Sequence, residues 1–299
     1  MLPTLTTTFL ATAVVTAASL WTPHQTSQDT ASDPTADEAR KADEPEADAK
    51  LVLATTYAEA MFDRREREAW SQLIPDDFAF VDPTADIWRA PYAKPIRGKD
   101  VFLRLEESWA IEWSTFARDV VFRAGDQVVL AGTIRWKAQN QPEAGPIGFA
   151  TILDLGDETV VGRRDYGDYD ALTANAAEVN ADRLAFADAY VASYLARDLA
   201  ALEGKVAHEV EFHAASAPEP VTGRFELLAH LEQAERPPTA RFQPTVRFVS
   251  TSHVFLAGHL DRTEEERADL PFALALRLED GRVREHREWV GIEADPRGD

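Results

Sequence analysis

Apolar positions recur at two spacings along the chain, first at intervals of three and four and then at every second position. The helical spacing covers Ala54–Leu73 and again Arg183–Leu202, and each stretch predicts an amphipathic helix. A short alternating segment follows each helix, at Phe78–Asp82 and at Val210–Ala214. Because helices precede strands, the pattern predicts an α+β fold rather than alternating βαβ units.

Each half continues with a second helix, which begins after Gly98 or Gly223, and then with a run of strands. The predicted strands lie at about 117–123, 127–137, 147–155 and 159–166, and at about 242–249, 253–262, 271–278 and 282–290. Asp157-Glu158 and Asp280-Gly281 lie at hairpin positions, and Asp-Gly is strongly favoured in tight turns. Each half therefore predicts an antiparallel meander behind its helices.

The two halves also repeat one another in sequence. Three pairs of segments match in order and at nearly constant spacing: Pro95–Leu103 with Pro220–Leu228, Val128–Ile134 with Val254–Leu260, and Phe149–Leu155 with Phe272–Leu278. Self-similarity at a fixed spacing is typical of duplicated units. We predict two copies of one domain, at residues 51–172 and 181–295, joined by the Ala-rich stretch Ala174–Asn180.

Composition narrows the classes of partner and chemistry. The chain has 299 residues, of which 45% are hydrophobic, which is enough for two domain cores. It has no cysteine, which excludes thiol nucleophiles, thiolate metal sites and disulfides. Its net charge of −21 disfavours nucleic acid and anionic membranes as partners. We expect no nucleic-acid partner and no stable membrane insertion beyond an N-terminal anchor.

The N-terminal segment resembles an export signal. The apolar run Phe9–Leu20 is too short to span a bilayer comfortably, and Ala17 and Ala18 are small enough for cleavage. The first basic residue is only Arg40, so a misassigned start or an uncleaved anchor is the alternative. We predict a signal peptide at residues 1–23, a disordered acidic linker at 24–50, and a periplasmic or secreted protein.

The closing segment Arg164-Asp165-Tyr166-Gly167-Asp168-Tyr169, with the element order and domain size, resembles the SnoaL-like branch of the nuclear transport factor 2-like superfamily. The resemblance covers nearly all of 51–295, twice. It implies two tandem cone-shaped domains, each with N-terminal helices packed on a strongly curved, mostly antiparallel sheet around a cavity. The superfamily includes ketosteroid isomerases, polyketide cyclases, limonene epoxide hydrolases and non-catalytic binding modules, so the fold leaves the function open.

Asp82 is the first catalytic candidate. Phe78, Phe80 and Asp82 share one strand face, where partial desolvation would raise the pKa of the carboxyl and make it a better general base. The resemblance implies the same role, since Val81-Asp82-Pro83 is similar to the segment bearing the catalytic aspartate of ketosteroid isomerases. It also implies Tyr57 as the oxyanion donor and Thr151 at the second donor position. The alternative is that Asp82 caps the turn at Pro83 and Tyr57 is a core aromatic.

Asp165 is the second catalytic candidate. A matching aspartate of limonene epoxide hydrolases belongs to an Asp-Arg-Asp set that activates water. Here the other two positions fall on Gly132 and Ile134, which argues against that mechanism. Asp165 could still orient a ligand or act as an acid, and the alternative is a salt bridge with Arg163 or Arg164.

Aromatic residues supply the candidate cavity wall. Trp136 shares strand parity with Leu130, and Trp109 and Trp113 fall on one face of the predicted second helix. Plain core packing is the alternative for all three. The ligand-binding candidates of the first copy are Phe80, Trp109, Trp113, Trp136, Thr151 and Tyr166. Gly132 and Gly258 are expected to mark bends where the strands curl.

The second copy reads as degenerate or repurposed. Tyr190 keeps the tyrosine position, whereas the aspartate position falls near His213–Ala214. Tyr190, His286 and Glu288 are its ligand-binding candidates, and no metal-ligand spacing such as His-x-x-x-His occurs. The P-loop and dinucleotide-binding glycine patterns are absent as well, so we expect neither a metal nor a cofactor.

These observations favour an exported protein that binds a small apolar or amphipathic molecule in the first copy. Any catalysis would be proton transfer of the isomerase or cyclase type, with Asp82 as base and Tyr57 as donor. The alternative is a non-catalytic binding or protein-interaction module in which the two copies form a pseudo-dimer. A third hypothesis is an envelope-associated accessory protein tethered by the acidic linker. The sequence leaves open whether the protein is an enzyme.

Overall fold

The computed structural model describes residues 48–88, 90–172, 177–214, 219–233, 241–261 and 269–291. These residues form two six-stranded sheets, each accompanied by helices. The predicted signal peptide and nearly all of the predicted acidic linker lie outside the described residues.

The first repeat comprises the following elements. They are α2 (Ala49–Ala58), the π-helical turn η1 (Glu59–Asp63), α3 (Arg67–Gln72), β1 (Ala79–Val81), the 3-10 turns η2 (Pro83–Trp88) and η3 (Pro91–Ala93), β2 (Ile96–Arg97), α4 (Lys99–Ser108), β3 (Ile111–Ala124), β4 (Gln127–Ala138), β5 (Glu143–Leu155), β6 (Val160–Gly167) and η4 (Tyr169–Leu172). Its strand order is β2-β1-β6-β5-β4-β3, with β1 and β6 parallel and the other neighbours antiparallel.

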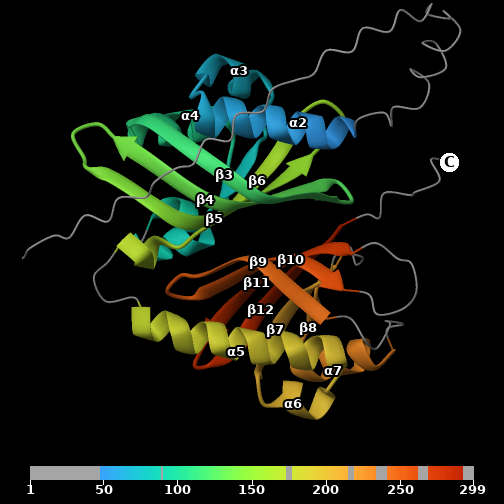
Figure 1. Ribbon diagram of the computed structural model, residues 1–299. Coiled ribbons are helices and arrows are strands. Elements are labelled where there is room, and N and C mark those ends of the chain that lie inside the picture. Colours follow the sequence, from blue (N-terminus) through green and yellow to red (C-terminus); the bar gives the residue numbers. More distant parts are fainter. Residues whose placement is uncertain are drawn as a thin grey trace, which may run out of the picture. The chain divides into compact units, whose positions relative to one another are not determined.

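The second repeat follows the same plan. It comprises α5 (Ala177–Ala196), α6 (Leu199–Glu203), β7 (Val206–His213), β8 (Val221–Thr222), α7 (Arg224–Gln233), β9 (Arg241–Val249), β10 (His253–Asp261), β11 (Leu270–Glu279) and β12 (Arg282–Val290). Its strand order is β8-β7-β12-β11-β10-β9, again with one parallel pair, β7 with β12. Figure 1 shows α2, α3 and α4 on one face of the first sheet and α5, α6 and α7 on one face of the second. The predicted α+β fold class is confirmed.

The first helix of each repeat is broken, which the apolar periodicity did not predict. Arg65 and Arg197 adopt φ values of 55° and 53°, between η1 and α3 and between α5 and α6 respectively. A left-handed residue cannot continue a right-handed helix. The guanidinium of Arg65 supports this turn, since it donates to the Met61 carbonyl at 2.9 Å and forms an ion pair with Glu106.

The prediction that Trp113 belongs to the second helix is wrong. Helix α4 ends at Ser108, and Ala110 reverses the chain with a φ of 50°. Strand β3 therefore begins at Ile111, well before the predicted start near residue 117, and carries Trp113. The Trp113 side chain is 37% exposed, so it belongs to neither the core nor a cavity wall.

The two strand glycines mark irregularities of the sheets, as predicted. The register shifts between Arg118 and Val120, opposite Gly132, and between Ala257 and Gly258. A Cβ atom on Gly132 would lie 2.0 Å from the carbonyl oxygen of Ala117, so only glycine admits this approach. Such bulges bend a strand and increase its twist, which curls the sheet.

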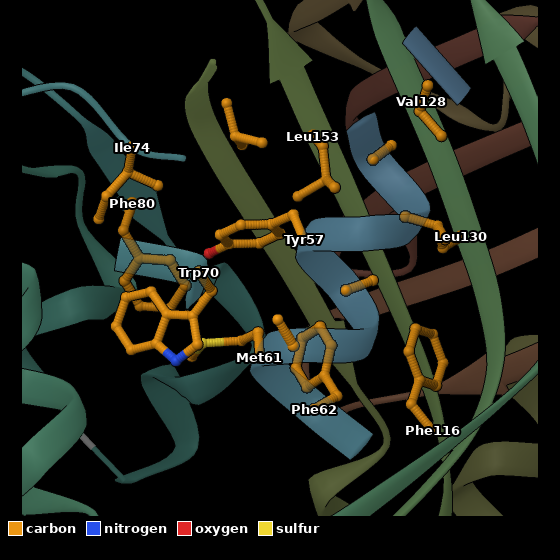
Figure 2. Packing of buried hydrophobic residues seen from close by; sticks show 14 of the residues in the cluster. Tyr57, Met61, Phe62, Trp70, Ile74, Phe80, Phe116, Val128, Leu130 and Leu153 are labelled. Atoms are coloured by element: carbon orange, nitrogen blue, oxygen red, sulfur yellow. The ribbon is translucent and has the colours of Figure 1, made fainter. Parts of the chain in front are cut away.

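Buried side chains form three clusters. One packs the helices of the first repeat against its sheet, with Tyr57 among Trp70, Phe80 and Leu153 (Figure 2). The second cluster does the same in the second repeat. The third contains residues of both sheets, including Tyr166 and Phe255, whose ring centroids lie 5.5 Å apart. Within the part of the chain that the structure describes, no helix is long and apolar enough to cross a membrane.

Candidate functional site

A cavity of about 240 Å³ lies in the first repeat. Apolar side chains form most of its wall and include Met61, Tyr92, Trp136 and Phe149. Polar side chains also line it, and they include Arg65, Asp82, Ser114, Arg163, Asp165 and Tyr169. A largely apolar pocket with a few convergent polar groups is typical of a small-molecule site.

Asp82 follows β1 directly and is only 2% exposed. Its Oδ1 accepts hydrogen bonds from the Thr84 backbone N–H at 3.0 Å, the Thr84 hydroxyl at 2.6 Å and the Ala85 N–H at 3.1 Å. These contacts cap the turn η2. The turn-capping alternative therefore describes Oδ1 well, yet the same side chain also lines the cavity.

The second oxygen of Asp82 faces Tyr169. The hydroxyl of Tyr169 donates to Oδ2 at 2.6 Å. Burial, and secondarily the nearby carboxylate of Asp165, raises the pKa of Asp82 to about 7, although hydrogen bonds from Thr84 and Tyr169 oppose the increase. A carboxyl that titrates near neutral pH can both accept and return a proton under physiological conditions.

Asp165 pairs with Arg163 on the same face of β6. The Arg163 Nε donates to Asp165 Oδ1 at 2.8 Å, and Nη2 contacts Oδ2. Both side chains are almost fully buried, and the guanidinium carbon lies 4.6 Å from the ring centroid of Phe62 and 5.2 Å from that of Phe80. The salt bridge posed as the alternative for Asp165 is thus present, and it lies in the cavity wall.

Tyr57 does not line the cavity, although its predicted role as an oxyanion donor requires its hydroxyl to point there. The side chain is fully buried in the helix–sheet core and is absent from the cavity wall. Its hydroxyl makes no hydrogen bond of normal geometry with the described residues. Burial raises the pKa of Tyr57, and the nearby Arg163 guanidinium opposes that increase. The hydroxyl that the structure brings to Asp82 is instead that of Tyr169, the last residue of the segment Arg164–Tyr169. This segment carries the family resemblance, but no pattern in the sequence assigned a role to Tyr169.

The remaining candidates of the first copy divide into two groups. Phe80, Trp109 and Trp136 line the cavity. Thr151 is fully buried in β5 and lies outside the cavity wall. Tyr166 belongs to the cluster shared by the two sheets, because alternation along β6 turns it away from the face that carries Asp165.

The second repeat carries a different polar set at the equivalent positions. Phe80 pairs with Arg163 across β1 and β6, and Phe212 pairs with His286 across β7 and β12, so His286 occupies the position of Arg163. The same register places Ala214 where the first repeat has Asp82. Ala214 therefore offers no carboxyl at the position of Asp82, whereas Glu288 stands at the position of Asp165.

Tyrosines complete this buried network. The Tyr190 hydroxyl lies 2.8 Å from Nδ1 of His286, and Tyr194 donates to Glu288 at 2.7 Å. All four side chains are at most 5% exposed. The three ligand-binding candidates of this copy, Tyr190, His286 and Glu288, are thus brought together inside the core.

One group of described residues has metal-ligand geometry. The ligand atoms of His259, Asp261 and Asp269 lie within 4.8 Å of one another. Nε2 of His259 is 3.6 Å from Asp261 and 3.8 Å from Asp269, so contacts between a partly exposed imidazole and two carboxylates account for the group.

Residues 187–286 match the family model of the SnoaL-like domain. The second repeat is therefore a SnoaL-like domain, and the first repeat shares its strand order and its single parallel pair. No curated protein matches the chain.

Solved structures with the same kind of fold also resemble the chain. A candidate SnoaL-like polyketide cyclase from Shewanella putrefaciens CN-32 is 18% identical, with a TM-score of 0.37 over 48% of this chain and 94% of that protein. A second candidate cyclase, from Shewanella denitrificans OS-217, is 18% identical, with a TM-score of 0.36 over 42% and 93%. A nuclear transport factor 2-like protein of unknown function from Burkholderia pseudomallei K96243 is 20% identical, with a TM-score of 0.35 over 41% and 93%. Similarities this low carry no information on activity.

Proposed function

We propose that this chain, whose second repeat is a SnoaL-like domain, binds a small apolar or amphipathic molecule in the cavity of the first repeat and transfers a proton there. The observation that carries the proposal is Asp82. Its carboxyl is 2% exposed, lies in the wall of a cavity of about 240 Å³, and has a pKa of about 7. Burial and a raised pKa would also suit a carboxyl that only caps the turn η2, but such a cap has no need to line a cavity.

The cavity wall supports an apolar ligand with a planar portion. Phe80, Tyr92 and Trp109 lie in mutual contact, with ring centroids between 5.7 and 6.0 Å apart. Such a wall offers dispersion contacts and ring faces but few hydrogen-bond partners. The reaction class that fits is abstraction of a proton from carbon followed by its return, as in an isomerisation or a cyclisation.

The test has two stages. A collection of small cyclic ketones and aromatic compounds is first screened for binding to the full chain by ligand-observed NMR. Each binder is then incubated with the protein in D₂O, and deuterium incorporation at carbon is followed. Asp82→Asn is expected to slow incorporation by about 10²–10⁴-fold, the usual contribution of a general base.

Asp168→Asn is the matched control. Burial also raises the pKa of Asp168, to about 6, but this residue lies outside the cavity wall. Its substitution should leave the exchange rate unchanged. If Asp82→Asn exchanges deuterium as fast as the wild-type protein, Asp82 is not the base and the catalytic part of the proposal fails.

A second candidate function rests on the cluster shared by the two sheets. Trp289 donates its indole N–H to Gln127 at 2.8 Å, and the rings of Tyr166 and Trp289 lie edge to face with centroids 6.4 Å apart. These contacts support a pseudo-dimer, in which each repeat serves as the partner that a single domain would otherwise need. Sedimentation at micromolar concentration tests it, because a pseudo-dimer predicts a monomeric chain and a stable homodimer argues against it.

Export remains part of the proposal on sequence grounds alone. Expression in a bacterial host, fractionation and N-terminal sequencing of the mature protein would test it. Removal of a segment of about residues 1–23, with recovery outside the cytoplasm, is the expected result. An intact N-terminus in the cytoplasmic fraction would contradict it.

A further inference from the structure

Tyr169 and Asp82 contribute to the cavity in different ways. Both line it, but Asp82 is only 2% exposed, whereas Tyr169 is half-buried. The Tyr169 side chain therefore presents more surface than that of Asp82, and both lie in the wall that a ligand in the cavity would contact.

The contacts of Asp82 fix where its proton can reside. Oδ1 already accepts three hydrogen bonds, two from Thr84 and one from Ala85. A carboxylate oxygen offers about two lone pairs, so Oδ1 is saturated as an acceptor. A proton taken up by Asp82 must reside on Oδ2, the oxygen that faces Tyr169 at 2.6 Å.

Protonation of Oδ2 reverses the hydrogen bond. While Asp82 is ionised, Tyr169 is the donor and Oδ2 the acceptor. Once Oδ2 carries a hydrogen, two hydroxyl hydrogens cannot share the short line between these oxygens. The carboxyl then donates to the Tyr169 oxygen, and the Tyr169 hydrogen turns towards another acceptor. The cavity that Tyr169 lines is mostly apolar, so an oxygen atom of a bound ligand would be a favourable acceptor there.

We propose, on the premise that the first repeat binds a ligand in this cavity, that Tyr169 donates a hydrogen bond to an oxygen of that ligand and that the protonation state of Asp82 decides whether it does. The ligand class is an uncharged, mainly apolar molecule with an acceptor oxygen, such as a ketone or an ester. Asp82 thus acts on the ligand oxygen through Tyr169, separately from the proton transfer proposed for its own carboxyl.

The charges that face Asp82 place this change near neutral pH. Asp165 on β6 raises the pKa of Asp82, while Arg163 on the same strand is engaged with Asp165. Arg65, the other cation of the cavity wall, forms an ion pair with Glu106. Tyr92 on η3 and Tyr169 on η4 are uncharged, since burial raises the pKa of both phenols. With Asp82 at a pKa of about 7, the ligand oxygen should be favoured below pH 7.

Two probes of matched shape measure the oxygen contact alone. In 2-acetylnaphthalene the side chain carries a carbonyl oxygen, and in 2-isopropenylnaphthalene a CH₂ group replaces that oxygen. Dissociation constants of both are measured with the full chain by fluorescence titration at pH 5.5 and pH 8.5. The ratio used below is the dissociation constant of 2-isopropenylnaphthalene divided by that of 2-acetylnaphthalene. It reports the preference for oxygen, because the apolar contacts contribute about equally to both constants.

The wild-type ratio should be about three- to tenfold larger at pH 5.5 than at pH 8.5, which is the usual net value of one hydrogen bond. Asp82→Asn should show the large ratio at both pH values, because the amide N–H₂ replaces the protonated Oδ2 as donor to Tyr169. Tyr169→Phe should show the small ratio at both. Asp168→Asn should behave as the wild type.

The outcomes separate this inference from the proposed function. If both probes bind and Ala138→Trp, a substitution in the cavity wall, abolishes binding, the cavity is the site. A wild-type ratio that ignores pH, or a Tyr169→Phe protein that keeps the wild-type pH dependence, then overturns the role of Tyr169 alone. If neither probe binds, or if Ala138→Trp binds both normally, the cavity is not a site for such ligands and both proposals fall.

Discussion

Arg163 and Asp165 lie two residues apart on one face of β6 and pair through two hydrogen bonds, Nε to Oδ1 at 2.8 Å and Nη2 to Oδ2. The pair is almost completely buried, beside Asp82 and beneath the rings of Phe62 and Phe80. It places a negative charge near Asp82 while supplying that charge with its own partner. The electrostatics of the cavity therefore depend on both members.

Asp165→Asn should destabilise the protein by about 3–5 kcal/mol, because it leaves the Arg163 guanidinium buried without a counter-charge. Urea unfolding followed by tryptophan fluorescence measures the loss. The double variant Arg163→Met/Asp165→Leu is the control, since it removes both charges and should cost clearly less. A single variant within ~1 kcal/mol of wild type would show that water or neighbouring groups replace the missing carboxylate.

Asp82 should make the folded state less stable as pH rises from about 4 to about 7. The pKa is about 7 in the folded protein against an ordinary value of 3.8 for an exposed aspartate, so between these limits the folded state binds more protons than the unfolded one. The free energy of unfolding then falls with rising pH, by up to ~4 kcal/mol across the window. Asp82→Asn should lack this component.

The contribution of Asp82 is measured as the difference between the free energies of unfolding of the wild type and of Asp82→Asn, determined as a function of pH. Burial lowers the pKa of His253 to about 4, against 6.5 in the unfolded chain. His253 therefore makes the free energy of unfolding rise with pH between these two values, which is opposite to the effect of Asp82. Subtracting the pH profile of Asp82→Asn from that of the wild type removes this and other contributions. Parallel profiles would mean that Asp82 titrates at its ordinary pKa in the folded protein.

Tyr57 and Tyr190 hold the same position in the two repeats and should respond differently to loss of the hydroxyl. Tyr57→Phe removes a buried hydroxyl that makes no hydrogen bond of normal geometry within the described residues, so its cost should be below ~0.5 kcal/mol. Tyr190→Phe removes the group that lies 2.8 Å from His286 and should cost about 1–3 kcal/mol. Chemical denaturation of both variants tests the ranking, and the reverse order would contradict it.

Gly132→Ala should destabilise the first sheet. The added Cβ would lie 2.0 Å from the Ala117 carbonyl oxygen, so strand β3 must shift or the bulge must be lost, at a cost of about 1–3 kcal/mol. Gly204→Ala is the control, because it has a negative φ and open space around its Cβ position. Thermal unfolding of the pair should separate them by several degrees, and equal melting temperatures would contradict the steric argument.

The duplication, the α+β class and the hairpin turns follow from the sequence because they depend on local periodicity and on residues that act over a few positions. The turn at Asp280-Gly281 is an example: both residues adopt positive φ, as the Asp-Gly pair predicts. The face shared by Phe80 and Asp82 is another, since alternation alone places both side chains on the same side of β1, and both line the cavity.

Only the tertiary structure decided which hydroxyl meets Asp82. Tyr57 and Tyr169 are separated from Asp82 by long stretches of chain, and nothing in their local patterns records the distance to its carboxyl. Arg65 shows the same limit, because its left-handed backbone breaks a helix whose apolar spacing continues through it. The sequence by itself determined the elements and the faces they bury. Packing of the helices and turns against the curved sheet decided which polar groups share the cavity, since contacts between distant segments depend on the whole fold.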